Sequence, residues 1–406
     1  MLTKAETNNA IVVRLTNVRK HPNADRLKLA TVLGTQVVVG LDAVEGQLVV
    51  YFDSNLQLLH DYLHCNNLYS NESLNADTTT RGYFGMNGRV KAQRLRGEIS
   101  NGYVAKIDTL RLPGINPSLV DELNEGDEFT HIGGIEICHK YITVKGAPGS
   151  HAGNKCMPCL AENFWRHWET HQLMRETNTI PIGPVRLEEK IHGTSGRTGN
   201  LLCCTGKRWW QFWRPAKEYR IVSGTRRVDH IQGHIPEVRR RIEEQVAPKL
   251  HQGEELYYEI YGYDIIGKRI QKLSDYGVPA GEFRVLLYRV TITTPDGQCY
   301  DLSRKEVDKR AEELGWEKPT VLWEGWYGIQ NTPYGGHPEM GAEIADLLHF
   351  ADRKSALDLN TLREGFVFWF QRPDGSWTCL KHKSAEFLAA ESALKDEGGG
   401  DVEDAL

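Results

Sequence analysis

The sequence predicts an α+β protein with two domains, an all-β domain followed by a domain of antiparallel sheets with flanking helices. The chain has 406 residues, which is too long for one ordinary hydrophobic core. Residues 1–140 contain short strand-like segments between turns and no long amphipathic pattern. Residues 181–388 instead alternate between strand-like and helix-like segments.

The strand-like segments of the N-terminal domain are short and are separated by turn residues such as Pro22, Gly34 and Gly46. They are residues 11–15, 28–32, 35–40, 47–52, 89–96 and 102–107. About five short strands without a long helix are typical of a small OB-like β-barrel. We expect the polar, Asn-rich segment 61–82 to be a surface loop of this barrel.

Three further regions follow along the chain. Residues 141–180 are rich in Gly, Pro and His and are predicted to be a linker leading into the second domain. In residues 181–388 we predict helices over 237–245 and 304–314, and strands over 256–261, 284–291, 365–370 and 377–381. Residues 389–406 are acidic and Gly-rich and are predicted to be a short helix end followed by a flexible tail.

The composition is that of a soluble globular protein, with 40% hydrophobic and 25% charged residues and a net charge of -5. Neither a bilayer-spanning apolar run nor the apolar core of a signal peptide is present, so we expect a cytoplasmic location. The eight cysteines are scattered and are expected to be reduced thiols. Cys156 and Cys159 with His167 and His171 resemble a zinc pattern, but the two pairs are closer together than a zinc finger needs.

The first candidate for chemistry is Lys190, which is followed by Ile191, His192 and Gly193. Glycine permits a close approach of the backbone to a ligand. A lysine attacks phosphorus only as the neutral amine, so it needs burial or nearby cations. Lys-x-x-Gly alone is a weak signal, and a solvated lysine at a turn is its ordinary interpretation.

Two acids and two lysines strengthen this interpretation. Glu259 and Glu364 each interrupt an apolar and aromatic strand-like segment, where a carboxylate is costly to bury unless it meets a cation or a metal. Lys381 and Lys383 lie on the same face of a predicted strand, because side chains alternate along it. Adjacent lysines repel each other, so the pair suggests an anionic ligand such as phosphate, unless it is merely an exposed basic strand edge.

These segments occur in the order Lys-Ile-His-Gly, Glu-Ile-Tyr-Gly, Glu-Gly-Phe-Val and Leu-Lys-His-Lys over residues 187–384. This order is similar to motifs I, III, IV and V of the covalent nucleotidyltransferase superfamily of ligases and capping enzymes. The resemblance implies a nucleotidyltransferase (ATP-grasp-like ligase) fold for residues 181–388. The Lys-Ile-His-Gly form, with His192, resembles the RNA ligase branch.

The resemblance implies a role for each matching residue. Lys190 would be the adenylated nucleophile, and Lys381 and Lys383 would be catalytic lysines that orient it and the α-phosphate. Tyr288 is preferred to Phe283 as the residue that stacks on adenine. The implied ATP-binding set is Glu189, Ile191, His192, Gly193, Arg226, Glu259, Tyr288, Lys381 and Lys383. Glu259 and Glu364 would hold Mg²⁺ or Mn²⁺. The sequence leaves both Arg226 and Arg227 as candidates for the motif Ia arginine.

The positions of the motifs indicate which ligase the chain resembles. Only 23 residues follow Lys383, so we expect no OB domain after motif V of the kind that DNA ligases carry. The N-terminal segment resembles the OB module of RNA ligases typified by the Naegleria and Deinococcus enzymes. That family joins 3′-hydroxyl RNA ends to 5′-phosphate ends and acts in RNA repair. The alternatives are a DNA ligase and a non-catalytic RNA-binding protein with a tRNA-binding-type OB module.

Two clusters are candidates for contact with the nucleic-acid partner. Arg89, Lys91, Arg94 and Arg96 form a basic stretch that we expect to contact phosphates. Residues 206–214 (GKRWWQFWR) interleave cations with aromatic rings, which suits either a nucleic-acid strand or a domain interface. We expect the run 239–241 (RRR) to be a solvated helix face. No protein partner and no membrane are implied.

Overall fold

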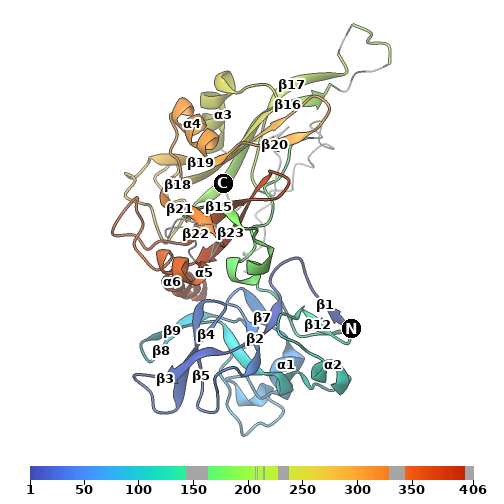
Figure 1. Cartoon of the computed structure of the whole chain (residues 1–406), viewed down its shortest axis with the longest axis vertical. Coiled ribbons are helices and arrows are strands. Elements are labelled where there is room, and N and C mark those ends of the chain that lie inside the picture. The colour runs from blue at the N-terminus through green and yellow to red at the C-terminus, as the bar shows by residue number, and fades with distance from the viewer. Residues whose placement is uncertain are drawn as a thin grey trace, which may run out of the picture. The chain divides into compact units, whose positions relative to one another are not determined.

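The computed structural model describes residues 1–142, 163–205, 207, 209–213, 215–226, 237–328 and 343–397. Its helices and antiparallel sheets confirm the α+β class (Figure 1). The chain divides into two compact units, residues 1–144 with 384–398 and residues 145–383 with 399–406. No helix within the described ranges is long and apolar enough to cross a membrane.

The N-terminal unit is built from short strands in several small sheets. A four-stranded sheet has the order β10 (Tyr103–Lys106), β6 (Leu48–Phe52), β2 (Ala10–Arg14) and β11 (Glu128–Phe129). A three-stranded sheet contains β3 (Thr16–Lys20), β4 (Leu27–Val32) and β5 (Thr35–Gly40). The smaller sheets pair β8 (Ala92–Leu95) with β9 (Glu98–Asn101), β7 (Leu56–Leu58) with β14 (Cys138–Lys140), and β1 (Leu2–Thr3) and β13 (Ile135–Glu136) with β12 (His131–Ile132).

These pairings do not close a barrel within the described part of the chain. Strands β5 and β9 are in contact, but they are not paired as neighbours in one of the described sheets. Hydrogen bonds that involve side chains link them. The Val38 amide donates to Ser100 Oγ at 3.0 Å, and Gln36 Nε2 donates to the Ile99 carbonyl at 3.0 Å. Segment 97–101, which lies between the predicted strand-like segments 89–96 and 102–107, contains strand β9.

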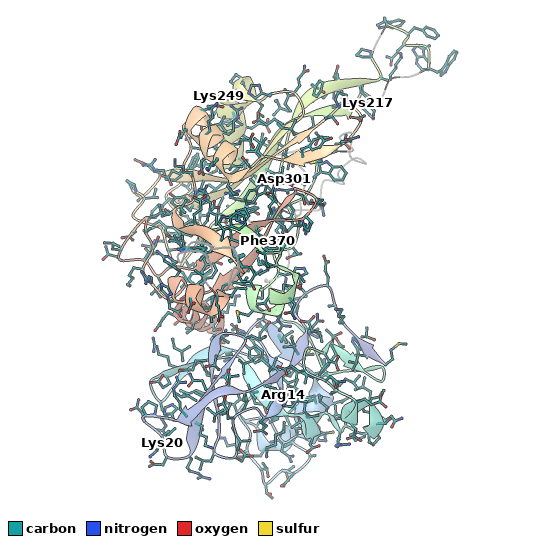
Figure 2. All side chains as sticks on the ribbon, in the orientation of Figure 1. Arg14, Lys20, Lys217, Lys249, Asp301 and Phe370 are labelled. Carbon is teal, nitrogen blue, oxygen red and sulfur yellow. The ribbon has the colours of Figure 1, made fainter. Side chains whose placement is uncertain are left out.

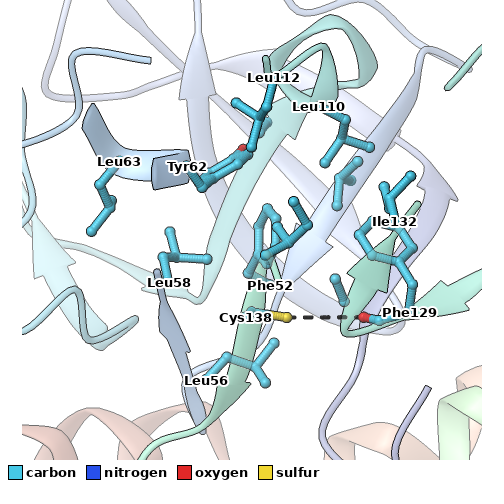
Figure 3. Packing of buried hydrophobic residues seen from close by; sticks show 14 of the residues in the cluster. Phe52, Leu56, Leu58, Tyr62, Leu63, Leu110, Leu112, Phe129, Ile132 and Cys138 are labelled. Carbon is cyan, nitrogen blue, oxygen red and sulfur yellow. Dashed lines mark hydrogen bonds between the residues drawn. The ribbon is translucent and has the colours of Figure 1, made fainter. Parts of the chain in front are cut away.

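The central sheet of this unit is buried on both faces. Val50 and Phe52 of β6 point into one apolar cluster, whereas Val49 and Tyr51 point into another. The first cluster also contains Tyr62, from helix α1 (His60–Cys65) (Figure 3). The segment expected to be a surface loop therefore contributes to the core. Polar residues dominate the composition of this segment, but its Tyr62 and Leu63 side chains are fully buried.

Helices α2 (Pro117–Asp121) and α6 (Ala385–Asp396) complete this unit. Helix α2 follows β10. Helix α6 packs on β8 and β9, and the Ser384 side chain caps its N-terminus. Residues 389–396, at the start of the segment predicted to be a short helix end and a flexible tail, are helical and belong to the N-terminal unit.

The second unit contains two antiparallel sheets. One has the order β21 (Val321–Tyr327), β15 (Gly183–Lys190), β22 (Gly365–Gln371) and β23 (Trp377–Lys383). The other has the order β17 (Lys217–Gly224), β16 (Thr194–Cys204), β18 (Glu254–Gly262), β19 (Phe283–Thr293) and β20 (Cys299–Asp301). Helices α3 (Glu237–Val246) and α4 (Arg304–Leu314) share an apolar cluster with β18 and β19, and the short α5 (Ile344–Leu347) packs with the first sheet. The predicted helices and strands of this unit agree with these elements.

The position of α6 predicts a stability effect. Phe387 is only 1% exposed, so Phe387→Ala should leave a cavity and lower the free energy of unfolding by about 3 kcal/mol. Urea unfolding followed by circular dichroism measures this change. The exposed Glu397, at the end of the same helix, provides the control Glu397→Ala, which should change stability little. Equal stability of the two variants would contradict a packed α6.

Candidate active site

Strand register brings the predicted motifs of the second unit together. Across the first sheet, Lys190 of β15 lies opposite Gly365 of β22, and Gly365 lies opposite Lys383 of β23. Glu364 immediately precedes Gly365, so its side chain reaches both lysines. In the second sheet, Ser195 of β16 lies opposite Glu259 of β18. The loop between β15 and β16 therefore connects Lys190 to the strand that lies opposite Glu259.

Glu364 is the centre of this group. Its Oε2 accepts a hydrogen bond from Lys190 Nζ at 2.9 Å, and its Oε1 lies 3.0 Å from Lys383 Nζ. His192 Nδ1 is 3.9 Å away. Burial alone would raise the pKa of the Glu364 carboxyl, but Lys190, Lys383 and His192 lower this pKa below its ordinary value. Glu364 is therefore a carboxylate that holds two lysines side by side.

Gly193 packs directly against strand β18. A Cβ at this position would lie 2.3 Å from the Ile260 carbonyl oxygen and 2.8 Å from Glu259 Cγ. The Gly193 amide donates to Glu259 Oε1 at 3.1 Å, and its carbonyl accepts from Gln271 Nε2 at 2.6 Å. These contacts fix the loop after Lys190 and explain the glycine of the motif.

Lys381 lies beside the Lys190–Glu364–Lys383 group on β23. Burial, followed by the charges of Lys383, Lys190 and Arg226, lowers the pKa of Lys381 to about 8. Arg226 in turn pairs with Glu169 at 2.5 Å. Arg227 lies outside the described residues. Lys190, Lys381, Lys383 and Arg226 thus form a partly buried cationic site, which favours an anionic ligand.

An aromatic and apolar wall lies next to these charges. Ile191 is buried in a cluster with Tyr261, Tyr276 and Leu286, against which Tyr288 packs. Burial and the Glu259 charge raise the pKa of the Tyr288 hydroxyl, which places Tyr288 close to the motif III acid. By contrast, Phe283 packs with the cluster under α3 and α4.

Glu189 is buried next to the lysine. Its Oε2 accepts from the Ala356 amide at 2.9 Å and lies 3.6 Å from Arg363 Nε. Its Oε1 has no hydrogen-bond partner among the described residues. A buried acceptor without a donor is uncommon and suits a ligand with an amino group.

Several residues of the site were missed by the sequence analysis. His167 belongs to the segment predicted to be a linker, yet its ring packs edge-on to Tyr288 with centroids 5.3 Å apart. Burial, followed by the charges of Arg289, Arg226 and Lys190, holds the pKa of His167 well below its ordinary value, so the ring is neutral. The Tyr276 hydroxyl accepts from the His192 amide at 2.7 Å. No sequence pattern marked Tyr276 or Gln271.

Arg239 also differs from its predicted role. It was expected on a solvated helix face, but it is 1% exposed, and its Nη2 donates to the Ser195 carbonyl at 2.9 Å. Arg240 and Arg241 of the same helix are exposed and pair with Glu237, as expected of surface cations. Arg239 therefore fixes the start of β16, just after the Lys-Ile-His-Gly segment.

Three of the four predicted nucleic-acid contacts in the N-terminal unit have partners on α6. Arg89 is 3% exposed, and its Nη1 pairs with Asp396 Oδ1 at 3.0 Å. Lys91 Nζ pairs with Asp396 Oδ2 at 2.9 Å, and Arg94 pairs with Glu386. The Arg89 side chain is thus buried and paired within the N-terminal unit. Arg96 is exposed.

The described residues contain no group of three or more His, Cys, Asp or Glu side chains that could hold a metal ion. Glu259 and Glu364 could still contribute one carboxylate each, because Mg²⁺ commonly binds one or two carboxylates together with phosphate oxygens and water. Cys156 and Cys159 of the zinc-like pattern lie outside the described residues. His171 Nδ1 lies 3.2 Å from Glu176 Oε1.

The fold of this chain is similar to that of solved RNA ligase structures. Structures of Naegleria gruberi RNA ligase match nearly the whole chain. The structure with PPi has a TM-score of 0.58 at 16% identity and covers 97% of this chain and 99% of that chain. A variant without ligand has a TM-score of 0.59 at 16% identity, covering 95% and 98%. A variant with AMP and Mn has a TM-score of 0.57 at 16% identity, covering 95% and 99%.

Likeness at this identity establishes the fold. The sequence matches no protein-family model and shows no significant similarity to a curated protein.

The packing of Gly193 predicts that even one methyl group disturbs the site. Gly193→Ala should lower the free energy of unfolding by about 1–3 kcal/mol, because the Cβ would overlap the β18 backbone. Gly183→Ala, in strand β15, is the matched control, since its Cβ would meet nothing within 4 Å. Urea denaturation of both variants measures the difference. Equal stabilities would contradict the close approach.

Proposed function

We propose that this protein is an ATP-dependent RNA ligase that carries AMP on Lys190 and joins 3′-hydroxyl RNA ends to 5′-phosphate ends. The observation that carries the proposal is the Lys190–Glu364–Lys383 group. In this group a partly exposed lysine lies among more positive than negative charges. The unit that contains it has a fold similar to that of solved RNA ligases. A DNA ligase or a non-catalytic RNA-binding protein is not favoured by any feature of this site.

The first step would be attack of Lys190 Nζ on the α-phosphorus of ATP. An N–P bond forms, the bond from the α-phosphorus to the bridging oxygen breaks, pyrophosphate leaves, and the amine gives up a proton. Lys381, Lys383 and Arg226 would neutralise the phosphate charge. Because the pKa of Glu364 is held low, this carboxylate is a poor base. We therefore assign it to positioning Lys190 and Lys383.

The nucleoside would bind along the apolar wall. Tyr288 offers a ring face for stacking on adenine, and Ile191 lies in the same cluster. The unpartnered Oε1 of Glu189 would accept a hydrogen bond from the adenine amino group. His192 and Gly193, held by Tyr276 and Glu259, would keep the loop in place under the nucleotide.

Glu259 and Glu364 are the residues that would hold Mg²⁺ or Mn²⁺. A bound divalent cation would add charge neutralisation at the phosphates. Structures of Naegleria gruberi RNA ligase variants contain ATP and Mn or AMP and Mn, which supports ATP and a divalent cation as the small-molecule partners proposed here.

The later steps involve RNA. AMP passes from Lys190 to the 5′-phosphate of an RNA end, and the 3′-hydroxyl of the other end then attacks that phosphate and releases AMP. The N-terminal unit is the proposed nucleic-acid-binding module. Arg94 and Arg96 of the predicted basic stretch are exposed, and Arg89, Lys91 and Arg94 would contact RNA only after release from α6.

The assignment of the nucleophile predicts a covalent adduct. Incubation with α-labelled ATP and Mn²⁺ should label the wild-type protein, and Lys190→Ala should abolish the label, because the amine next to Glu364 is lost. Denaturing electrophoresis detects the adduct. The control Lys305→Ala removes an exposed lysine from α4 and should label normally. Persistence of the label in Lys190→Ala would refute the proposed nucleophile.

The lowered pKa of Lys381 predicts a pH dependence of ATP binding. Lys381 is charged below about pH 8 and loses its charge as the pH rises, so ATP affinity should fall about tenfold between pH 7 and pH 9. Lys381→Arg keeps its charge over this range and should flatten the decline. Equilibrium binding of an ATP analogue with a non-cleavable bridge between the α- and β-phosphorus measures affinity without chemistry, and it keeps Lys190, whose charge contributes to the lowered pKa of Lys381. An unchanged decline in Lys381→Arg would remove Lys381 from the phosphate site.

A further inference from the structure

The hairpin between β16 and β17 ends in a group of exposed aromatic rings. Trp209, Phe212 and Trp213 are 80%, 78% and 79% exposed, and Trp210 is 43% exposed. Figure 2 shows ring side chains at this tip, beyond the labelled Lys217. The four residues are called the aromatic tip below. Apolar groups gathered on a surface usually mark a binding site.

The base of this hairpin is well anchored. Leu201 and Cys203 of β16 are buried against Val222 of β17 and Phe164. At the end of the ladder, the Thr205 amide donates to the Ala216 carbonyl at 3.0 Å, and Thr205 Oγ1 donates to the Pro215 carbonyl at 2.6 Å. The described core of the hairpin ends at Thr205, and the rings lie beyond it.

The sequence of the tip indicates the chemistry of its partner. Residues 207–217 contain four cations, namely Lys207, Arg208, Arg214 and Lys217, and no acid. They also contain no Leu, Ile, Val or Met. Cations suit phosphates, and flat rings suit the faces of nucleobases. The absence of aliphatic side chains disfavours insertion into lipid, where aliphatic groups usually accompany aromatic ones.

We propose that the aromatic tip is a binding platform for single-stranded RNA, on which bases stack while the flanking Lys207 and Lys217 contact phosphates. This proposal rests on the proposed ligase function and adds a second RNA contact to it, in the catalytic unit itself. The tip would hold the RNA strand and take no part in adenylation, since it contributes no residue to the lysine site.

The test uses the full-length protein with the triple substitution Trp209→Ala, Phe212→Ala and Trp213→Ala. Binding of a fluorescent single-stranded RNA of about 20 nucleotides is measured by anisotropy without ATP, over a series of salt concentrations. We expect affinity at least about tenfold weaker at every salt concentration, with an unchanged slope of log affinity against log salt, because the cations remain. Lys207→Ala with Lys217→Ala should instead reduce that slope.

Two controls separate this role from general loss of structure. Ile266→Ala with Leu359→Ala removes exposed apolar side chains elsewhere in the same unit and should bind RNA normally. The triple variant should form lysyl-AMP at the wild-type rate, which shows that its catalytic unit is folded. Normal RNA binding by the triple variant overturns the proposal. So does tip-dependent binding to phosphatidylcholine–phosphatidylserine vesicles in the absence of tip-dependent RNA binding.

Failure of this proposal and failure of the ligase proposal give different results. RNA binding is measured without ATP, so loss of lysyl-AMP in the wild-type protein would refute only the ligase function. Conversely, wild-type lysyl-AMP formation together with unchanged RNA binding in the triple variant would refute only the role of the tip.

Discussion

The buried carboxylate of Glu364 is the interaction on which the site depends. A carboxylate that is 1% exposed loses its hydration, and this cost must be offset by nearby cations. Lys190 and Lys383 supply that compensation, and Glu364 in turn lets two lysines lie close together. Without it, Lys190, Lys381 and Lys383 would repel one another. The same arrangement leaves net positive charge for an anionic ligand.

Backbone packing sets where this group can form. Gly365 has φ +149°, and a Cβ there would lie 2.1 Å from the His382 carbonyl oxygen, so β22 and β23 approach closely beside Glu364. Gly193 does the same against β18. The two glycines thus bring the acids and lysines of different strands within hydrogen-bonding distance. Their role is steric, and it explains why glycine follows both Lys190 and Glu364 in the motifs.

Charges elsewhere in the chain serve structure as well as binding. The chain leaves the site at Lys383 and begins α6 at Ala385, directly after the Ser384 cap. The acids of α6 then pair with Arg89, Lys91 and Arg94, so most of the predicted basic stretch contributes to the N-terminal unit. RNA recognition would then rely more on other cations, among them Arg96 and those of the aromatic tip.

The sequence by itself determined the α+β class, the main strands and helices of the second unit, and the identity of the charged residues, because these depend on local periodicity and on motif order. Tertiary structure alone decided which of them meet. Strand register placed Glu364 between Lys190 and Lys383, and burial separated Arg239 from its exposed neighbours Arg240 and Arg241. Composition did not predict how α1 and α6 pack, because their polar segments carry only a few side chains that distant strands bury. Such pairing and burial arise from contacts far apart in the chain, which no local pattern records.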